Sequence, residues 1–179
     1  MTKKKNSVFI ATSLDGCIAD KDGGIDWLNT FPEINNIDTG YEAFTARIDA
    51  LVMGRNTYET VLGFDIDWPY QKPVFVVSNS LSDVPENLKG KVFIVKGALA
   101  EILAEIHQYG HYRLYIDGGR LIQSFLSEDL IDEMIITIIP VVLGRGIPLF
   151  ADQPDMLMFI CQETKLFLDA IVQNHFIKK

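Results

Sequence analysis

Two glycine-containing segments of the chain carry residues suited to binding phosphate groups. The first, Gly54-Arg55-Asn56-Thr57, follows the apolar run 51–53 and precedes a helical pattern. The N–H groups in the first turn of a helix attract anions, and an arginine adds a permanent charge with several hydrogen-bond donors. Thr57 is also placed to cap the helix, as in an ordinary turn. These residues therefore fit an anion site and a capped turn equally well.

The second segment is Gly118-Gly119, which separates the strand-like run 114–117 from the helical pattern 120–126. Glycines at such a junction let the backbone approach a ligand phosphate closely, although tight packing would also explain them. Together the two segments predict an extended ligand with two phosphate groups, such as a dinucleotide. The sequence lacks the G-x-G-x-x-G and Walker patterns of the common nucleotide-binding families.

Two further segments carry polar residues directly after apolar runs. Ser78-Asn79-Ser80 offers short hydroxyl and amide groups to another phosphate or a ribose, or else forms a polar turn. Arg145 lies between glycines in the segment 140–150, where it faces a substrate or simply turns the chain. Both segments become interesting if the runs before them are strands of one sheet.

The segment 11–27 combines the glycines and aspartates of a mobile surface loop with apolar side chains. Ile18 and Trp27 are too apolar to be left exposed without a partner. A loop that carries apolar residues over the carboxyl edge of a sheet is suited to close over a flat, partly apolar ring. We therefore expect a lid that is mobile without ligand and protected when the ligand is bound.

The elements that position these residues follow from the hydrophobic pattern. Strand-like runs rich in β-branched and aromatic residues occupy 8–12, 50–53, 74–78, 92–95, 114–117 and 134–139. Helical patterns lie between several of them, at 41–48, 57–62, 98–109 and 120–126. This alternation predicts a largely parallel sheet covered on both faces, whose ligands bind outside the carboxyl ends of the strands. The runs 159–167 and 170–177 predict a C-terminal antiparallel hairpin, which makes the α/β sheet mixed.

Length and composition limit the possible classes of protein. The 179 residues suit a single domain, 1–179, and the net charge of −8 argues against a nucleic-acid partner. Apolar runs are too short for a membrane helix, so we expect a cytoplasmic protein. We expect Cys17 and Cys161 to be buried thiols without a disulfide. We expect no metal site, because a helix should end between His107 and His111.

Taken in order, these segments resemble the dihydrofolate reductase superfamily, and most closely the branch with the reductase domain of bacterial riboflavin biosynthesis. The matching pieces cover nearly the whole chain: SLDGCIA (13–19), DALVMGRNTYE (49–59), VVSNS (76–80), IDGGRLIQSFL (116–126) and PVVLGRGIPLF (140–150). The resemblance implies a sheet of about eight strands and a reductase that uses NADPH.

The resemblance also implies where NADPH would bind. It places Ala11 and Ile18 beside the nicotinamide, Gly54, Arg55, Asn56 and Thr57 on the adenosine phosphate and pyrophosphate, Ser78 and Asn79 at the adenosine end, and Gly118, Gly119, Arg120, Leu121 and Ile122 around the pyrophosphate. The candidate substrate contacts are Trp27, Tyr41 and Arg145.

The residues expected to bind the substrate differ from the pattern of folate reductases, and the chain also departs from the pattern of riboflavin-type reductases. Folate reductases place a carboxylate on the helix that crosses the pterin pocket, and Asp38 falls near that position, but Tyr41, Glu42 and Phe44 do not reproduce the pocket. Riboflavin-type reductases usually accompany a deaminase domain, whose H-x-E and P-C-x-x-C signature is missing here. Asp38 is the first candidate for organising a proton and Asp15 the second, although either also fits an exposed loop aspartate.

The expected activity is therefore hydride transfer from NADPH to a carbon–nitrogen or carbonyl-type double bond. The substrate would be a small heterocyclic or ribosylamino compound, as for a 5-amino-6-(5-phosphoribosylamino)uracil reductase. A genuine dihydrofolate reductase, or a protein that binds NADPH without turnover, are the alternatives. The apolar C-terminal run near a sheet edge predicts a homodimer.

Overall fold

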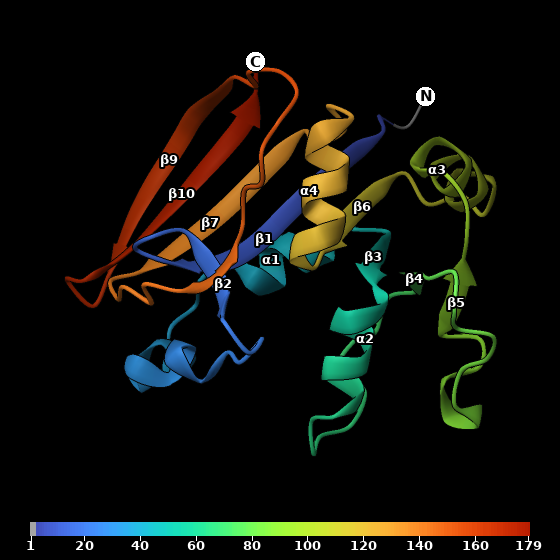
Figure 1. Cartoon of the computed structure of the whole chain (residues 1–179), viewed down its shortest axis with the longest axis horizontal. Coiled ribbons are helices and arrows are strands. Elements are labelled where there is room, and N and C mark those ends of the chain that lie inside the picture. Colours follow the sequence, from blue (N-terminus) through green and yellow to red (C-terminus); the bar gives the residue numbers. More distant parts are fainter. Residues whose placement is uncertain (1–2) are drawn as a thin grey trace.

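The computed structural model describes residues 3–179, which form an eight-stranded sheet with helices packed on both faces (Figure 1). The strands are β1 (Lys5–Ser13), β3 (Ala50–Gly54), β4 (Val74–Val77), β5 (Val92–Val95), β6 (Arg113–Asp117), β7 (Glu133–Ile139), β9 (Phe159–Phe167) and β10 (Ile171–Lys178). The α-helices are α1 (Tyr41–Ala46), α2 (Arg55–Leu62), α3 (Leu99–Gln108) and α4 (Gly119–Ser127). Short 3-10 helices cover Asp26–Thr30 (η1), Pro32–Asn36 (η2) and Glu86–Leu88 (η3).

The strand order is β5-β4-β3-β6-β1-β7-β10-β9. From β5 to β7 every neighbouring pair is parallel, whereas β10 runs antiparallel to both β7 and β9. This confirms the expected mixed, mostly parallel sheet with a C-terminal antiparallel hairpin. The hairpin turns at Leu168 and Asp169, which both adopt positive φ angles.

The helices cover the two faces of the sheet through separate apolar cores. On one face, α3 and α4 pack over the central strands, and Ile102, Ile122 and Phe125 are fully buried there. On the other face, Phe44 of α1 and Tyr58 of α2 pack against the strands. The sequence pattern located α3 well, because its apolar residues recur on one side and it ends before Gly110.

The segment after β1 differs from the mobile loop that the sequence suggested. Residues Cys17–Asp20 form the short strand β2, which pairs antiparallel with β8 (Gly146–Pro148) outside the main sheet. This pairing ties the segment 11–27 to the segment after β7, over 120 residues away in sequence. Neither short strand has a strong local pattern, so only the tertiary contact reveals them.

The two cysteines are free, but only one lies in the core. Cys17 is buried, as expected, whereas Cys161 is exposed on β9, which corrects the prediction of two buried thiols. β9 is the outermost strand beside β10, and its side chains are exposed along most of its length. In the described part of the chain, no helix is both long and apolar enough to cross a membrane.

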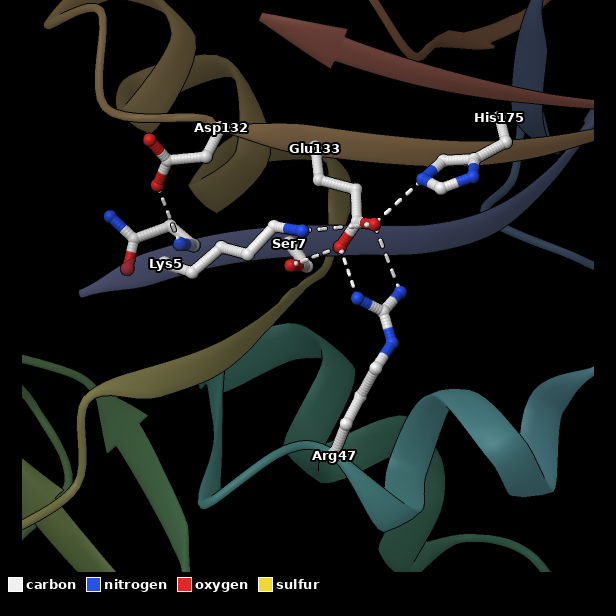
Figure 2. Close-up of polar contacts among 7 residues, drawn as sticks. Lys5, Ser7, Arg47, Asp132, Glu133 and His175 are labelled. Carbon is white, nitrogen blue, oxygen red and sulfur yellow. Dashed lines mark hydrogen bonds and ion pairs between the residues drawn. The ribbon is translucent and has the colours of Figure 1, made fainter. Parts of the chain in front are cut away.

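A network of charged side chains joins four segments at the amino ends of β1 and β7 (Figure 2). Glu133, the first residue of β7, is almost fully buried, with 1% of its side chain exposed. Its carboxylate accepts hydrogen bonds from Ser7 at 2.7 Å and Arg47 at 3.0 Å, and pairs with Lys5 at 3.1 Å. His175 Nε2 of β10 lies 2.6 Å from the same carboxylate. The network therefore links β1, β7, β10 and the end of α1.

Candidate functional site

The strand order creates a crevice at the carboxyl ends of β3 and β6. These two strands are neighbours, but β3 leads outward to β4, whereas β6 leads in the other direction to β7, past β1. In open α/β sheets, ligands bind where the connections diverge in this way. A cavity of about 620 Å³ lies at this place. Its lining comes mainly from β1, β2, α2, β6 and the start of α4.

Two helix starts face this cavity without side-chain caps. The N-cap positions of α2 and α4 are Gly54 and Gly118, and neither helix receives a side-chain cap from the described residues 3–179. The N–H groups of both first turns are therefore open to a ligand, as an anion site requires. Thr57 does not cap α2, which corrects that expectation, because the helix already begins at Arg55.

The two glycine junctions lie against each other. Gly118 has a φ of +93°, which side chains rarely adopt, and a Cβ added there would collide with the Thr57 hydroxyl. The same Cβ would lie 3.9 Å from the Gly54 nitrogen, so both helix starts border one space. A Cβ on Gly119 would meet the Ile18 side chain, which lies over this junction. The paired glycines therefore serve local packing as well as the open cavity.

Arg55 lies at the edge of the cavity, between the ends of β3 and β4. Its Nη1 donates to the Ser80 hydroxyl at 3.0 Å, and its Nε lies 3.8 Å from the Glu59 carboxylate. The Arg55 side chain is 45% exposed, so solvent or a ligand can reach it. Ser78 is buried, and its hydroxyl accepts backbone hydrogen bonds from Ser80 and Leu81. The Arg55 guanidinium and the hydroxyl groups of Ser78 and Ser80 therefore lie close together at the edge of the cavity.

The predicted cofactor residues divide into two groups. Those that line the cavity are Ala11, Ile18, Gly54, Arg55, Asn56, Thr57, Gly118, Gly119, Arg120 and Leu121. Ser78 and Asn79 lie beyond the lining, next to Ser80. Ile122 of α4 is fully buried in the core and lies outside the cavity lining, so its predicted contact with the cofactor stays a prediction.

The segment that was expected to form a lid supplies one wall of the cavity. Ile18 and Ala19 of β2 line the cavity. Ile25 and Leu28, at the following 3-10 helix η1, and Ile147 of β8 line it as well. The predicted contact Trp27 lies next to this wall without lining the cavity, and its indole N–H is buried without a partner among the described residues. The apolar wall is thus built by neighbours of Trp27.

Asp117 is the acid that sequence reasoning missed. It is the last residue of β6, lines the cavity, and accepts a hydrogen bond from the Gly118 N–H at 2.8 Å. Burial raises the pKa of the Asp117 carboxyl to about 6, against the lowering effect of that hydrogen bond. A carboxyl with such a pKa can hold or release a proton near neutral pH. The sequence did contain a signal for Asp117, because this residue ends a predicted strand directly before Gly118-Gly119.

Aromatic side chains surround Asp117. Tyr70 lines the cavity, and Tyr41 contacts Phe9 edge-to-face at 5.3 Å between ring centroids. Burial raises the pKa of the Tyr41 and Tyr70 phenols, and the nearby Asp117 charge raises both further. Tyr115 donates its hydroxyl to the Phe9 carbonyl oxygen at 2.9 Å. Tyr41, predicted as a substrate contact, therefore lies near Asp117 but beside the cavity lining.

Asp15 and Asp38, the two acids predicted to organise a proton, both accept local hydrogen bonds in the structure. Asp15 accepts hydrogen bonds from the Ser13 hydroxyl and from the Leu143 and Gly144 N–H groups. These bonds, led by the one from Ser13, lower the pKa of the Asp15 carboxyl to about 2, so it stays ionised at neutral pH.

Asp38 is exposed and accepts a hydrogen bond from the Gly40 N–H at 2.8 Å, in the turn before α1. Neither aspartate lines the cavity, and neither does the exposed Arg145, whose neighbours hold Asp15. All three residues lie outside the cavity lining, and the proton role of the aspartates and the substrate contact of Arg145 stay predictions.

Comparison with known proteins identifies the family. Residues 5–172 match the model of the RibD C-terminal domain, so the chain belongs to this family. The protein YwjB of Bacillus subtilis (strain 168) is 40% identical over 180 residues, which cover 98% of this chain and 99% of YwjB. A crystal structure from Shewanella sp. PV-4, whose name proposes a role in riboflavin biosynthesis, is 53% identical with a TM-score of 0.93. It covers 98% of this chain and 99% of that one.

More distant structures show how widely the fold is shared. A deaminase/5-amino-6-(5-phosphoribosylamino)uracil reductase from Thermotoga maritima has a TM-score of 0.73 at 13% identity, over 99% of this chain and 57% of that longer one. Dihydrofolate reductase from Enterococcus faecalis, complexed with NADP(H), has a TM-score of 0.66 at 15% identity, over 98% and 96% of the two chains. The chain therefore has the reductase fold shared by these enzymes, which confirms the resemblance seen in the sequence.

Proposed function

We propose that this chain is an NADPH-dependent reductase that transfers hydride to a small heterocyclic substrate. The observation that carries the proposal is one cavity that joins two uncapped helix starts to a carboxyl with a pKa of about 6. The helix starts suit the phosphates of a dinucleotide, and the carboxyl suits a proton transfer. The family supports this proposal, because other proteins of the same fold are named as reductases.

The residues around the cavity fit NADPH. The first turns of α2 and α4 offer N–H groups to the pyrophosphate, and Arg120 at the second position of α4 adds a charge. Arg55 and Ser80 offer charged and neutral donors to the adenosine 2′-phosphate. Ala11 and Ile18 give the nicotinamide an apolar surface. When bound, the cofactor supplies the hydride.

The chain's own contribution is positioning, exclusion of water and control of one proton. The wall of Ile18, Ile25 and Leu28 keeps water from the reacting face of the substrate. Asp117 holds the proton that the reduced nitrogen or oxygen of the substrate requires. Reduction of a carbon–nitrogen or carbonyl bond then balances as one hydride to carbon and one proton to the heteroatom.

The proposal is tested by titration followed by turnover. Saturable binding of NADPH, followed by its oxidation with pterins or aminouracil compounds, is the expected result. Binding without oxidation of NADPH by any of these compounds would favour the alternative of a binding protein. Failure to bind either NADPH or NADP⁺ at millimolar concentration would refute the proposal altogether.

Arg55→Ala is expected to weaken NADPH binding by about ten- to 150-fold and to leave NADH binding nearly unchanged. The reason is the loss of charge-assisted hydrogen bonds to the 2′-phosphate, typically worth about 1.5–3 kcal/mol. The fold should survive, because Arg55 is half exposed and its ion pair with Glu59 is a surface contact. Titration of both cofactors by fluorescence or calorimetry measures the effect.

Arg120→Ala is the matched control for that prediction. Arg120 is exposed at the start of α4, where it would meet the pyrophosphate that both cofactors contain. Its loss should weaken NADPH and NADH by similar factors. Equal losses for both cofactors in Arg55→Ala would instead show that Arg55 only shapes the turn.

Saturating NADPH is expected to slow amide hydrogen exchange in residues 14–27. Ile18, Ile25 and Ala19 form a wall of the cavity, so a bound cofactor would hold this segment closed over it. Mass spectrometry with and without NADPH measures the change, and strand β9, at the far edge of the sheet, serves as the internal control. Unchanged exchange in 14–27 at saturation would show that the segment is a fixed wall and not a lid.

A further inference from the structure

The positive charges of the cavity gather at the helix starts. Arg55 is the first residue of α2 and Arg120 the second residue of α4, where the phosphates of a dinucleotide would bind. Within residues 3–179, the other side chains that line the cavity include no lysine, arginine or histidine. Under the proposed function, both cationic side chains of the cavity would therefore bind the cofactor.

The remainder of the cavity has apolar walls and a negative charge. Ile10, Ile25 and Leu28 line it together with the Tyr70 phenol and the Asp117 carboxyl. The hydrogen-bond partner of Asp117 is a neutral backbone N–H, that of Gly118, at 2.8 Å. None of the ion pairs within residues 3–179 involves Asp117, and its charge raises the pKa of the nearby Tyr41 and Tyr70 phenols.

Resting on the proposed function, we propose that the substrate is an uncharged heterocycle of the pterin or aminouracil kind that carries no phosphate group. A phosphate in this half of the cavity would lose its water, contact apolar side chains and face a carboxylate of the same sign. A neutral ring instead packs against Ile25 and Leu28, and its polar edge can hydrogen-bond to the Asp117 carboxyl in either protonation state.

This substrate class separates the chain from one of its structural neighbours. The Thermotoga maritima protein is named for the reduction of 5-amino-6-(5-phosphoribosylamino)uracil, a phosphorylated compound. In this chain, a phosphorylated substrate would need a cation outside the cavity lining. Arg145, exposed between β7 and β8, is the residue to test for that role.

The test compares two matched pairs of ligands that differ only in the phosphate group. The pairs are 5-amino-6-(5-phosphoribosylamino)uracil with its dephosphorylated form, and hydroxymethyl dihydropterin with its phosphate ester. Each is titrated into the protein saturated with NADP⁺, whose own binding is measured first. We expect at least one neutral ligand to bind, and to bind at least about tenfold more tightly than its phosphorylated partner.

Two variants separate electrostatic exclusion from other causes. Asp117→Asn removes the negative charge and should reduce the preference for the neutral ligand severalfold, whereas Arg145→Ala should leave that preference unchanged. Tighter binding of the phosphorylated ligands, or binding of neither neutral ligand to the NADP⁺-loaded protein, would overturn the inference while leaving the reductase proposal intact. A protein that does not take up NADP⁺ would instead refute the proposed function itself.

Discussion

Asp117→Asn is expected to lower kcat by about 10²- to 10⁴-fold, the usual contribution of a positioned acid or base. Asparagine keeps the size of the side chain and can still accept the hydrogen bond from the Gly118 N–H. It has no proton to give at the pH of the assay. Affinity for NADPH should therefore change little, because the helix starts and Arg55 remain in place. Steady-state kinetics and cofactor titration on the same preparations separate the two effects.

The pH dependence gives this prediction a second measurement. An acid catalyst works in its protonated form, and burial raises the pKa of Asp117 to about 6. The kcat of the wild-type chain should therefore fall as the pH rises through about 6, and Asp117→Asn should lack this limb. A variant that keeps kcat within about threefold and retains the same pH profile would rule out Asp117 as the proton donor.

Asp117→Asn should also make the folded protein more stable at neutral pH. The folded pKa of Asp117, about 6, lies above the usual value of 3.8, so its ionisation between these values opposes folding. The cost is fully present above about pH 6 and corresponds to about 1–3 kcal/mol of unfolding free energy. Thermal unfolding at pH 7.5 and pH 4 should show the gain only at the higher pH. A loss of stability at both values would mean that Asp117 is structural.

Glu133→Gln is expected to cost about 3 kcal/mol of unfolding free energy. Removing one partner of a buried ion pair typically costs about 3–5 kcal/mol, because the other charges remain without compensation. We expect the lower end of this range, since Lys5 and Arg47 are 29% and 37% exposed and can recover some hydration. Chemical denaturation at pH 7 measures the loss. Figure 2 shows how these groups converge on one carboxylate.

The sign of the pH effect for Glu133 is opposite to that for Asp117. Burial alone would raise the pKa of the Glu133 carboxyl, but hydrogen bonds from Arg47 and Ser7 and the charges of Arg47 and Lys5 lower it to about 2. Its stabilising effect is therefore complete above the usual pKa of 4.5 and is lost as the pH falls toward 2. The stability of Glu133→Gln should depend less on pH in that window.

A surface ion pair provides the control for this prediction. Glu86 contacts Lys89 at 2.6 Å, but its side chain is 86% exposed. Glu86→Gln should change the unfolding free energy by less than about 0.5 kcal/mol. If Glu133→Gln cost no more than this control, the buried network would be irrelevant to stability. Retained activity in Glu133→Gln at low temperature would show that the network supports the fold and not the reaction.

Local patterns in the sequence were enough to predict the strands of the main sheet and its α-helices. Each parallel strand is a short apolar run, and α3 and α4 each present one apolar face, so their types follow from periodicity. The carboxyl ends of parallel strands share one edge of the sheet, so residues that follow different strands could be grouped from the sequence alone. That rule brought Gly54 and Gly118 together correctly.

The chemistry of individual acids could not be predicted in the same way. Asp15, Asp38 and Asp117 are the same residue type close to glycines, and nothing local distinguishes them. The structure ties Asp15 to N–H groups near residue 143, exposes Asp38, and places Asp117 in the cavity beside tyrosines from other segments. The pKa of each carboxyl depends on these distant neighbours.

The sequence by itself therefore determined the strands of the main sheet, its α-helices, and the sheet edge at which the cavity lies. Only the tertiary structure decided which acid is buried beside the cavity, that β2 and β8 pair there, and that Glu133 contacts both Lys5 and Arg47. The physical reason is that periodicity and turn chemistry act over a few residues. Burial and electrostatic interactions act between segments that only the folded chain brings together.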